Sequence, residues 1–316
     1  MEKRNLKNLA LAILSFVISF YLFGIRFEFL PDTPNAFSVF LAAIALCVLS
    51  IALILSTISL NLHRTIYLVS GIAFVFLTFM AASPMVRRHD NIALSARAQN
   101  SFFQAIIISH STFTIGNKQL AETIDVAIKP SVDHLTEVLE EPPFYILLLA
   151  LAQLGIACGI GLWIGKGIDE ITHLLPIALV ATVADIWSVS AGATAQIIVS
   201  SSINYFLLRF PVISTGSIPY LIGLTDFLFY AIFLQAAIKF KLGTVKNTIV
   251  LFLSFIPAVA GALFFQTGLP VLPFMALFFV IANWKNLSIK KEEVKTIVGF
   301  IIGILIIFTL VSFAIN

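Results

Sequence analysis

The chain has 316 residues, of which 59% are hydrophobic and 11% are charged, with a formal net charge of +3. An ordinary soluble domain carries about 25% charged residues, so this composition excludes one and predicts a polytopic membrane protein. The basic residues lie mostly in short loops without interleaved aromatics, which argues against a nucleic-acid partner. Cys47 and Cys158 lie in apolar segments, away from any histidine or second cysteine, so neither a metal nor another cofactor is expected.

Apolar stretches of membrane-spanning length recur along the chain. A helix needs about 20 apolar residues to cross ~30 Å of hydrocarbon. This criterion predicts an all-α polytopic fold with about nine transmembrane helices, near residues 8–25, 36–60, 65–83, 143–165, 174–199, 217–238, 247–266, 268–284 and 296–314. The first stretch has no small-residue cleavage site, so we expect it to be retained as a span.

Basic residues predict the orientation of these helices, because cytoplasmic loops carry an excess of lysine and arginine. With the N-terminus inside, alternate loops that hold basic residues are inside as well: these residues are Lys3, Arg4, Lys7, His63, Arg64, Lys166, Lys239, Lys241, Lys246, Lys285, Lys290, Lys291 and Lys295. The sequence therefore predicts a cytoplasmic N-terminus and an external C-terminus, in a prokaryotic cytoplasmic membrane.

Between the third and fourth spans lies a region with a soluble composition, residues 84–142. Apolar residues at helical spacing around Pro130 predict amphipathic helices there, packed on the membrane domain or lying at its surface. The stretch from Phe102 to Ile115 is too short and too polar for a predicted span, although a tenth crossing there would invert everything that follows.

The fourth span contains four glycines at small-xxx-small spacing. Gly155 pairs with Gly159, and Gly161 pairs with Gly165. Small residues at this spacing let the backbones of neighbouring helices approach closely, so we interpret them as packing positions.

Asp185 and Asp226 are the charged residues that lie well inside apolar spans. A carboxylate at the bilayer centre costs roughly 2.5–3.5 kcal/mol on insertion scales, so such residues indicate function. Both aspartates are predicted at about the same depth on antiparallel neighbouring helices, where they can meet. Two aspartates that share one proton and titrate as a unit can hydrolyse a peptide bond, one acting as a general base and the other polarising the carbonyl.

Two motifs support this chemistry. Gly223-Leu224-Thr225-Asp226 resembles the G-x-G-D motif of the presenilin and signal peptide peptidase family of intramembrane aspartyl proteases. Further along, Pro270-Val271-Leu272-Pro273 resembles that family's P-A-L motif, with one complete predicted span between the two. Thr225, Ala184 and Val271 differ from the residues usual in that family, which makes the chain similar to a divergent, prokaryotic-like member.

The predicted spans divide the chain into four regions, and the resemblance, which covers roughly Leu174 to Trp284, implies a catalytic core and its site. Residues 1–83 would form an N-terminal three-helix membrane region, 84–142 an extramembrane loop, 143–284 the catalytic membrane core and 285–316 an additional transmembrane helix. Asp185 and Asp226 would be catalytic. The residues expected to position a transmembrane peptide substrate within the lipid bilayer are Gly223, Leu224, Thr225, Pro270, Val271, Leu272 and Pro273.

Two other functions remain open. Paired intramembrane acids also serve as proton or cation sites in secondary transporters, often beside broken helices. A catalytically silent relative that binds transmembrane helices is the third interpretation. Pro270 alone is a common first-turn residue of a helix, and Gly223 alone is a common packing residue.

Overall fold

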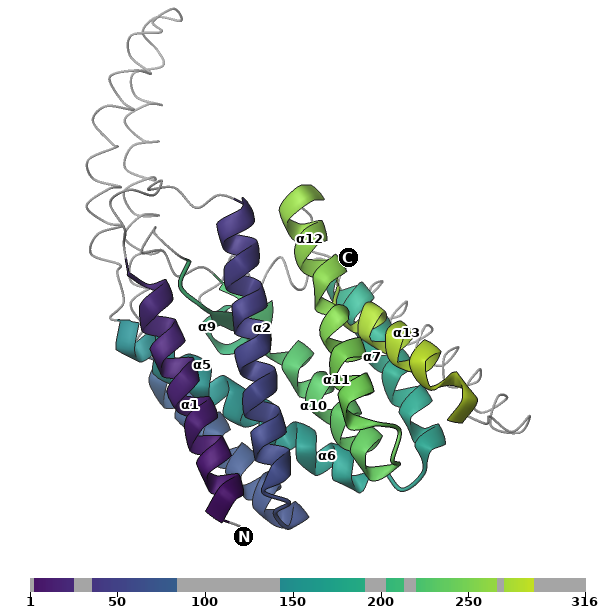
Figure 1. The fold of residues 1–316 in the computed structure, drawn as a ribbon. Coiled ribbons are helices and arrows are strands. Elements are labelled where there is room, and N and C mark those ends of the chain that lie inside the picture. Colours follow the sequence, from purple (N-terminus) through teal and green to yellow (C-terminus); the bar gives the residue numbers. More distant parts are fainter. Residues whose placement is uncertain are drawn as a thin grey trace, which may run out of the picture.

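The computed structural model describes residues 3–25, 36–83, 143–190, 203–212, 220–265 and 270–286. The predicted loop of residues 84–142 lies outside these ranges, with its amphipathic helices and the stretch from Phe102 to Ile115. So does the predicted span 296–314. The described part of the chain is mostly helical, as expected of an all-α membrane protein (Figure 1).

Five of the described helices are long and apolar enough to cross a membrane. They are Lys3–Phe23 (α1), Phe37–Ser59 (within α2, Ala36–Ser59), Arg64–Ser83, Pro143–Gly167 and Thr244–Gly261. Large apolar side chains such as Leu11, Leu14 and Phe76 are exposed on them. Exposed apolar faces of this kind are stable against lipid, whose tails are as apolar as leucine.

The helix of Pro143–Gly167 contains a π-helical turn. It runs through α5 (Pro143–Ile156), the π segment η1 (Ala157–Gly161) and α6 (Leu162–Gly167). The glycines of this helix pack tightly, because a Cβ added at Gly159 would overlap the Cα of Gly71, and one added at Gly161 would lie 2.7 Å from the Leu228 carbonyl oxygen. The predicted packing role of these glycines is confirmed.

The helix of Thr244–Gly261 is broken into α11 (Thr244–Leu253) and α12 (Phe255–Phe265). Pro257 explains the break, since a proline removes a backbone donor and its ring crowds the carbonyl four residues earlier, at Leu253. At the break, both the Ser254 N–H, at 3.3 Å, and the Ser254 hydroxyl, at 2.5 Å, donate to the Leu251 carbonyl.

Three further described helices fall on predicted spans but are shorter than the five above. The helices α7 (Leu174–Ser190), α10 (Leu224–Lys239) and α13 (Leu272–Asn283) have 17, 16 and 12 residues. Since a crossing takes about 20 residues, the total of nine spans stays a prediction. Single 3₁₀ turns precede α7 (η2, Ile171–His173) and follow α13 (η3, Trp284–Asn286).

A two-stranded antiparallel sheet corrects the start of the predicted span 217–238. After the short helix α9 (Ile203–Phe206), strand β1 (Leu207–Arg209) pairs with β2 (Tyr220–Gly223), which leads directly into α10. Leu208 lies opposite Ile222, and the register shifts between Leu208 and Arg209. Because each strand satisfies the other's backbone groups, extended chain is tolerated here among the helices.

The centre of the described structure is α10. Its side chains are buried along nearly its whole length, and it packs against α5–η1–α6, α11, α13 and α2. A helix that is apolar all round is buried either among other elements or in lipid, and α10 is covered mainly by other elements. In Figure 1, α1 and α2 lie side by side at one edge, and α7 and α13 lie together at the opposite edge.

Several of the predicted inner loops lie together at one end of the helix bundle, which we call the basic end. The Lys166 ammonium donates to the Leu62 carbonyl at 2.7 Å, and the Lys239 ammonium donates to the Ile168 carbonyl at 2.6 Å. The Asn5 amide donates to the Ser59 carbonyl at 2.7 Å, so the start of α1 lies at the same end. The predicted grouping of these loops is therefore seen, while the side of the membrane that they face stays a prediction.

Candidate active site

Asp226 lies in the first turn of α10, immediately after β2. The backbone N–H of Gly223 donates to Asp226 Oδ2 at 3.2 Å. The residue is only 8% exposed. Its carboxyl group therefore accepts a hydrogen bond from one of the backbone N–H groups that a helix start leaves without a partner. This bond fixes the carboxyl group relative to both β2 and α10.

Asp185 lies on α7 and is bonded to a different element. The backbone N–H of Leu272, the first residue of α13, donates to Asp185 Oδ2 at 3.1 Å. Again the carboxyl group serves an N–H at the start of a helix, here one that belongs to another segment of the chain. The proline motif and the first aspartate, which are far apart in the sequence, are thus in direct contact.

The two carboxyl groups lie within the range of a coulombic interaction with each other. Their depths also agree: Asp185 follows the start of α7 by eleven residues, about 17 Å, and Asp226 precedes Lys239 at the end of α10 by thirteen residues, about 20 Å. Both of those helix ends belong to the basic end, so both acids lie at a similar depth.

The neighbours of the two helices differ from the sequence-based prediction. The helix of Asp185 was expected to pack beside the helix of Asp226, whereas α7 packs mainly along α13. In turn, α13 contacts α10, where the rings of Phe279 and Phe233 lie 5.0 Å apart. The pattern of apolar residues could not predict this, because α7 and α10 are apolar on every side.

The residues around Asp226 leave little room. A Cβ added at Gly223 would lie 3.0 Å from Asp226 Oδ2 and 3.4 Å from Thr225 Oγ1. Leu224 is half-buried and Thr225 is exposed. The three residues predicted to position a substrate are therefore next to the carboxyl group, and Gly223 is the one whose size is restricted.

The proline motif begins α13. Pro270 and Val271 precede the helix, and Leu272 and Pro273 are its first two residues. The first helical hydrogen bond runs from the Met275 N–H to the Val271 carbonyl at 3.0 Å. Of the two N-terminal residues of this helix, Pro273 has no N–H that needs an acceptor, and the Leu272 N–H donates to Asp185.

Aromatic residues that follow Asp226 on α10 pack against α12. Phe227 stacks on Phe255 with ring centroids 5.4 Å apart, and both side chains are fully buried. One turn along α10, the Tyr230 hydroxyl donates to the Thr248 carbonyl at 3.2 Å. Within the described ranges, no group of three or more histidine, cysteine, aspartate or glutamate residues lies close enough to hold a metal ion.

A buried amide pair next to α13 was missed by the sequence reasoning. Asn283 donates to Asn247 Oδ1 at 2.6 Å, and both side chains are fully buried. The Lys246 ammonium donates to Asn283 Oδ1 at 2.9 Å. The signal was present, because an asparagine within an apolar span calls for a partner just as an aspartate does.

A scan against protein-family models finds no match for this sequence, and a search of curated proteins finds none either.

Proposed function

We propose that the chain is an intramembrane aspartyl protease that cleaves transmembrane helices. The observation that carries the proposal is that two carboxyl groups from separate apolar helices lie within coulombic range of each other, and that each accepts a hydrogen bond from a backbone N–H at a helix start. The order and type of the flanking motifs, from Gly223 to Asp226 and from Pro270 to Pro273, also support it, through their resemblance to the presenilin and signal peptide peptidase family.

In the proposed reaction the two carboxyl groups share one proton. The ionised carboxylate takes a proton from a water molecule, whose oxygen bonds to the scissile carbonyl carbon, while the protonated acid donates to the carbonyl oxygen. The tetrahedral intermediate then collapses, the C–N bond breaks and the amine leaves with a proton from the dyad. Since the pair titrates as a unit, neither aspartate is assigned as the base.

Substrate would bind in an extended conformation. A transmembrane helix hides its peptide bonds in its own hydrogen bonds, so it must unwind locally before water can attack. Strand β2 ends at Gly223, three residues before Asp226, and is paired with β1 along one edge. We propose that an unwound substrate segment pairs with extended backbone beside the dyad, either β2 or the segment around Pro270.

Replacing each aspartate by asparagine tests the proposal. The amide oxygen of asparagine can still accept the N–H bond from Gly223 or Leu272, so the helix caps are kept and only the acid is lost. Purified Asp185→Asn and Asp226→Asn in lipid nanodiscs should each lose cleavage of a model transmembrane substrate by at least about a thousandfold. The matched control is Asp169→Asn, which removes an exposed carboxylate and should cleave at the wild-type rate.

Full cleavage by either asparagine variant would rule out the dyad. The arrangement also offers a second function, because paired buried acids beside interrupted helices are found at proton and cation sites in secondary transporters. Proton flux into liposomes that hold the wild type, absent from both asparagine variants and accompanied by no peptide cleavage, would favour transport. Unchanged behaviour of both variants in both assays would leave the carboxyl groups with a capping role only.

A further inference from the structure

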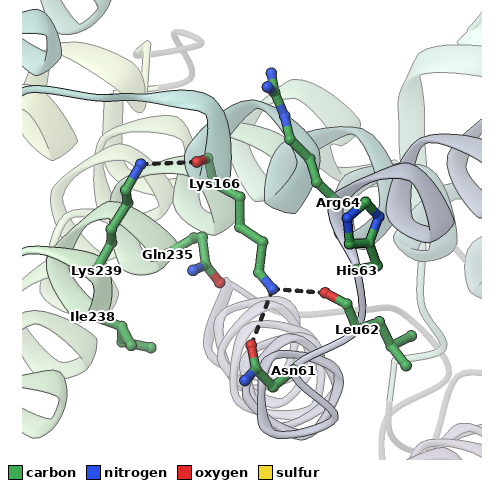
Figure 2. A pocket seen from close by; sticks show the side chains of 8 residues that line it. All are labelled: Asn61, Leu62, His63, Arg64, Lys166, Gln235, Ile238 and Lys239. Carbon is green, nitrogen blue, oxygen red and sulfur yellow. Dashed lines mark hydrogen bonds between the residues drawn. The ribbon is translucent and has the colours of Figure 1, made fainter.

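An open cavity of about 570 Å³ lies at the basic end, away from the two aspartates. Its polar lining residues are Asn61, His63, Arg64, Lys166, Gln235 and Lys239 (Figure 2). They come from the end of α2, the start of helix Arg64–Ser83 and the ends of α6 and α10. The cavity thus lies where four helices meet, and none of its lining residues belongs to the proposed catalytic site.

The cavity carries an excess of positive charge. Arg64, Lys166 and Lys239 are cationic, and within the described ranges the carboxylate near them is that of Asp169, 3.7 Å from the Lys239 ammonium and 88% exposed. The side chains are held in place by carbonyl groups: Lys239 donates to the Lys166 carbonyl at 3.0 Å, and Arg64 Nε to the Trp163 carbonyl at 3.2 Å. Carbonyl groups at helix ends attract cations in many proteins, yet they do not neutralise them.

Gln235 gives the second, independent observation. It is 6% exposed, and among the described residues its buried Oε1 has no hydrogen-bond partner. Figure 2 shows its side chain between those of Lys166 and Lys239. An unsatisfied buried amide is costly, so its position indicates a polar group that enters the cavity from outside the chain.

The position of the cavity along the helices identifies the class of ligand. Arg64 begins one candidate span, Lys166 is next to the last residue of another, and Asn61 lies two residues beyond a third. These ends lie where polar lipid head groups border the hydrocarbon. The guanidinium of Arg64 also lies 5.0 Å from the ring centre of Trp163, a residue type enriched at this level of the bilayer.

We propose that this cavity binds the head group of an anionic glycerophospholipid. The phosphate would interact with Arg64, Lys166 and Lys239, and a head-group hydroxyl would donate to Gln235 Oε1. Basic pockets between helix ends hold anionic lipids by this combination of charge and hydrogen bonds. The site is separate from the two aspartates, and the proposal does not depend on the proposed protease activity.

Native mass spectrometry of the delipidated wild type tests the proposal first. Phosphatidylglycerol, phosphatidylcholine with the same acyl chains, and inorganic phosphate are titrated separately. One phosphatidylglycerol should bind about tenfold more tightly than phosphatidylcholine, because the choline cation is repelled by the basic side chains and has no hydroxyl to donate to Gln235 Oε1, although both phosphates accept the same hydrogen bonds. Equal affinity for the two lipids would overturn the proposal. Competition by millimolar inorganic phosphate would support a phosphate site but overturn its assignment to lipid.

The charge of the site is tested with the double variant Arg64→Gln/Lys239→Gln. Its affinity for phosphatidylglycerol should fall about tenfold or more. The matched control, Lys241→Gln/Lys285→Gln, removes two exposed cations outside the cavity and should bind as the wild type does. An equal loss in both double variants would show only a general attraction of the protein for anionic lipid, and would overturn the proposal.

Gln235→Leu keeps the test decisive if the charge variants fail to fold. Removing an amide whose buried Oε1 has no partner in the described part of the chain should raise the melting temperature of the lipid-free protein. The same change should reduce the further rise that phosphatidylglycerol produces. A purely structural glutamine would give the reverse, namely a less stable lipid-free protein with an unchanged response to lipid, and that result would overturn the role of Gln235.

Discussion

At Gly223 a missing side chain determines how Asp226 is held. The glycine N–H donates to the carboxylate, and the same residue leaves the space that the carboxylate occupies. Its backbone lies at φ −69° and ψ 142°, a conformation open to any residue. The restriction at this position is therefore one of space, so an alanine can form the strand but must displace the carboxylate.

Gly223→Ala should lower the cleavage rate while leaving the fold intact. The added methyl group would lie 3.0 Å from Asp226 Oδ2, which forces a shift of a few tenths of an ångström. A small misplacement of a reacting group is costly, and we expect a loss of about tenfold in kcat. Cleavage of the model substrate and the melting temperature are measured together.

The matched control for this prediction is Gly24→Ala. A Cβ at Gly24 would meet its nearest neighbour, the Phe20 carbonyl oxygen, at 3.4 Å, an ordinary contact. This variant should cleave at the wild-type rate. Wild-type cleavage by Gly223→Ala would show that the space beside Asp226 is not critical.

At the scale of elements, α13 connects two parts of the molecule. Its first residue donates to Asp185, and its last residue, Asn283, is bonded to Asn247 and Lys246 of α11. The buried amide pair fixes the far end of the helix because amides away from water need partners. The position of Asp185 against Leu272 therefore depends on contacts about three helical turns away.

A double-mutant cycle on Asn247 and Asn283 should detect this connection. Each single alanine variant leaves the other amide buried without its partner, at a cost of about 1–3 kcal/mol. In the double variant the lost free energies of unfolding should not add, and the interaction free energy should lie between about 0.5 and 3 kcal/mol. Reversible unfolding in mixed detergent micelles measures all four proteins.

Asn286→Ala serves as the control for the amide pair, since this asparagine is exposed just beyond α13. Its free energy of unfolding should stay within about 0.5 kcal/mol of the wild-type value. Strict additivity of the two alanine substitutions would mean that α11 and α13 are held by their apolar contacts alone.

At the scale of the whole molecule, the basic end is the feature from which the orientation in the membrane is predicted. The start of α1, the end of α2 and the ends of α6 and α10 meet there through hydrogen bonds made by Asn5, Lys166 and Lys239. Basic residues near helix ends favour the cytoplasmic side. The proposed orientation places the basic end in the cytoplasm and both aspartates about 17–20 Å away from it.

Cysteine labelling in intact cells tests this orientation. Ile25, just after α1, is 45% exposed, and Lys241, just after α10, is exposed at the basic end. An impermeant thiol reagent outside should modify Ile25→Cys and leave Lys241→Cys unmodified until the membrane is permeabilised. The native Cys47 and Cys158 are both buried, so the background should be low. The reverse pattern would place the basic end outside.

Local composition predicts the long apolar helices and singles out the two aspartates of the candidate site. The long apolar helices and the isolation of Asp185 and Asp226 are visible in short windows of sequence, because both follow from the cost of polar groups in hydrocarbon. The strand Tyr220–Gly223 was not predicted, since a strand of four residues exists only through its pairing with Leu207–Arg209, and that pairing is non-local. The packing of α7 on α13 was missed for the same reason.

The backbone contact between Gly71 and Gly159 bears on how this sequence can change over evolutionary time. A methyl group at either position would meet the opposite backbone, so neither glycine can be replaced alone while the helices keep this crossing. Gly161, two residues after Gly159, lies against α10, the helix of Asp226. A shift of the helix that carries Gly159 would therefore also disturb this second contact. In any lineage that retains this arrangement, the two glycines should persist together or be lost together. The pair thus marks a fixed point around which more tolerant surface positions of the helices are free to diverge.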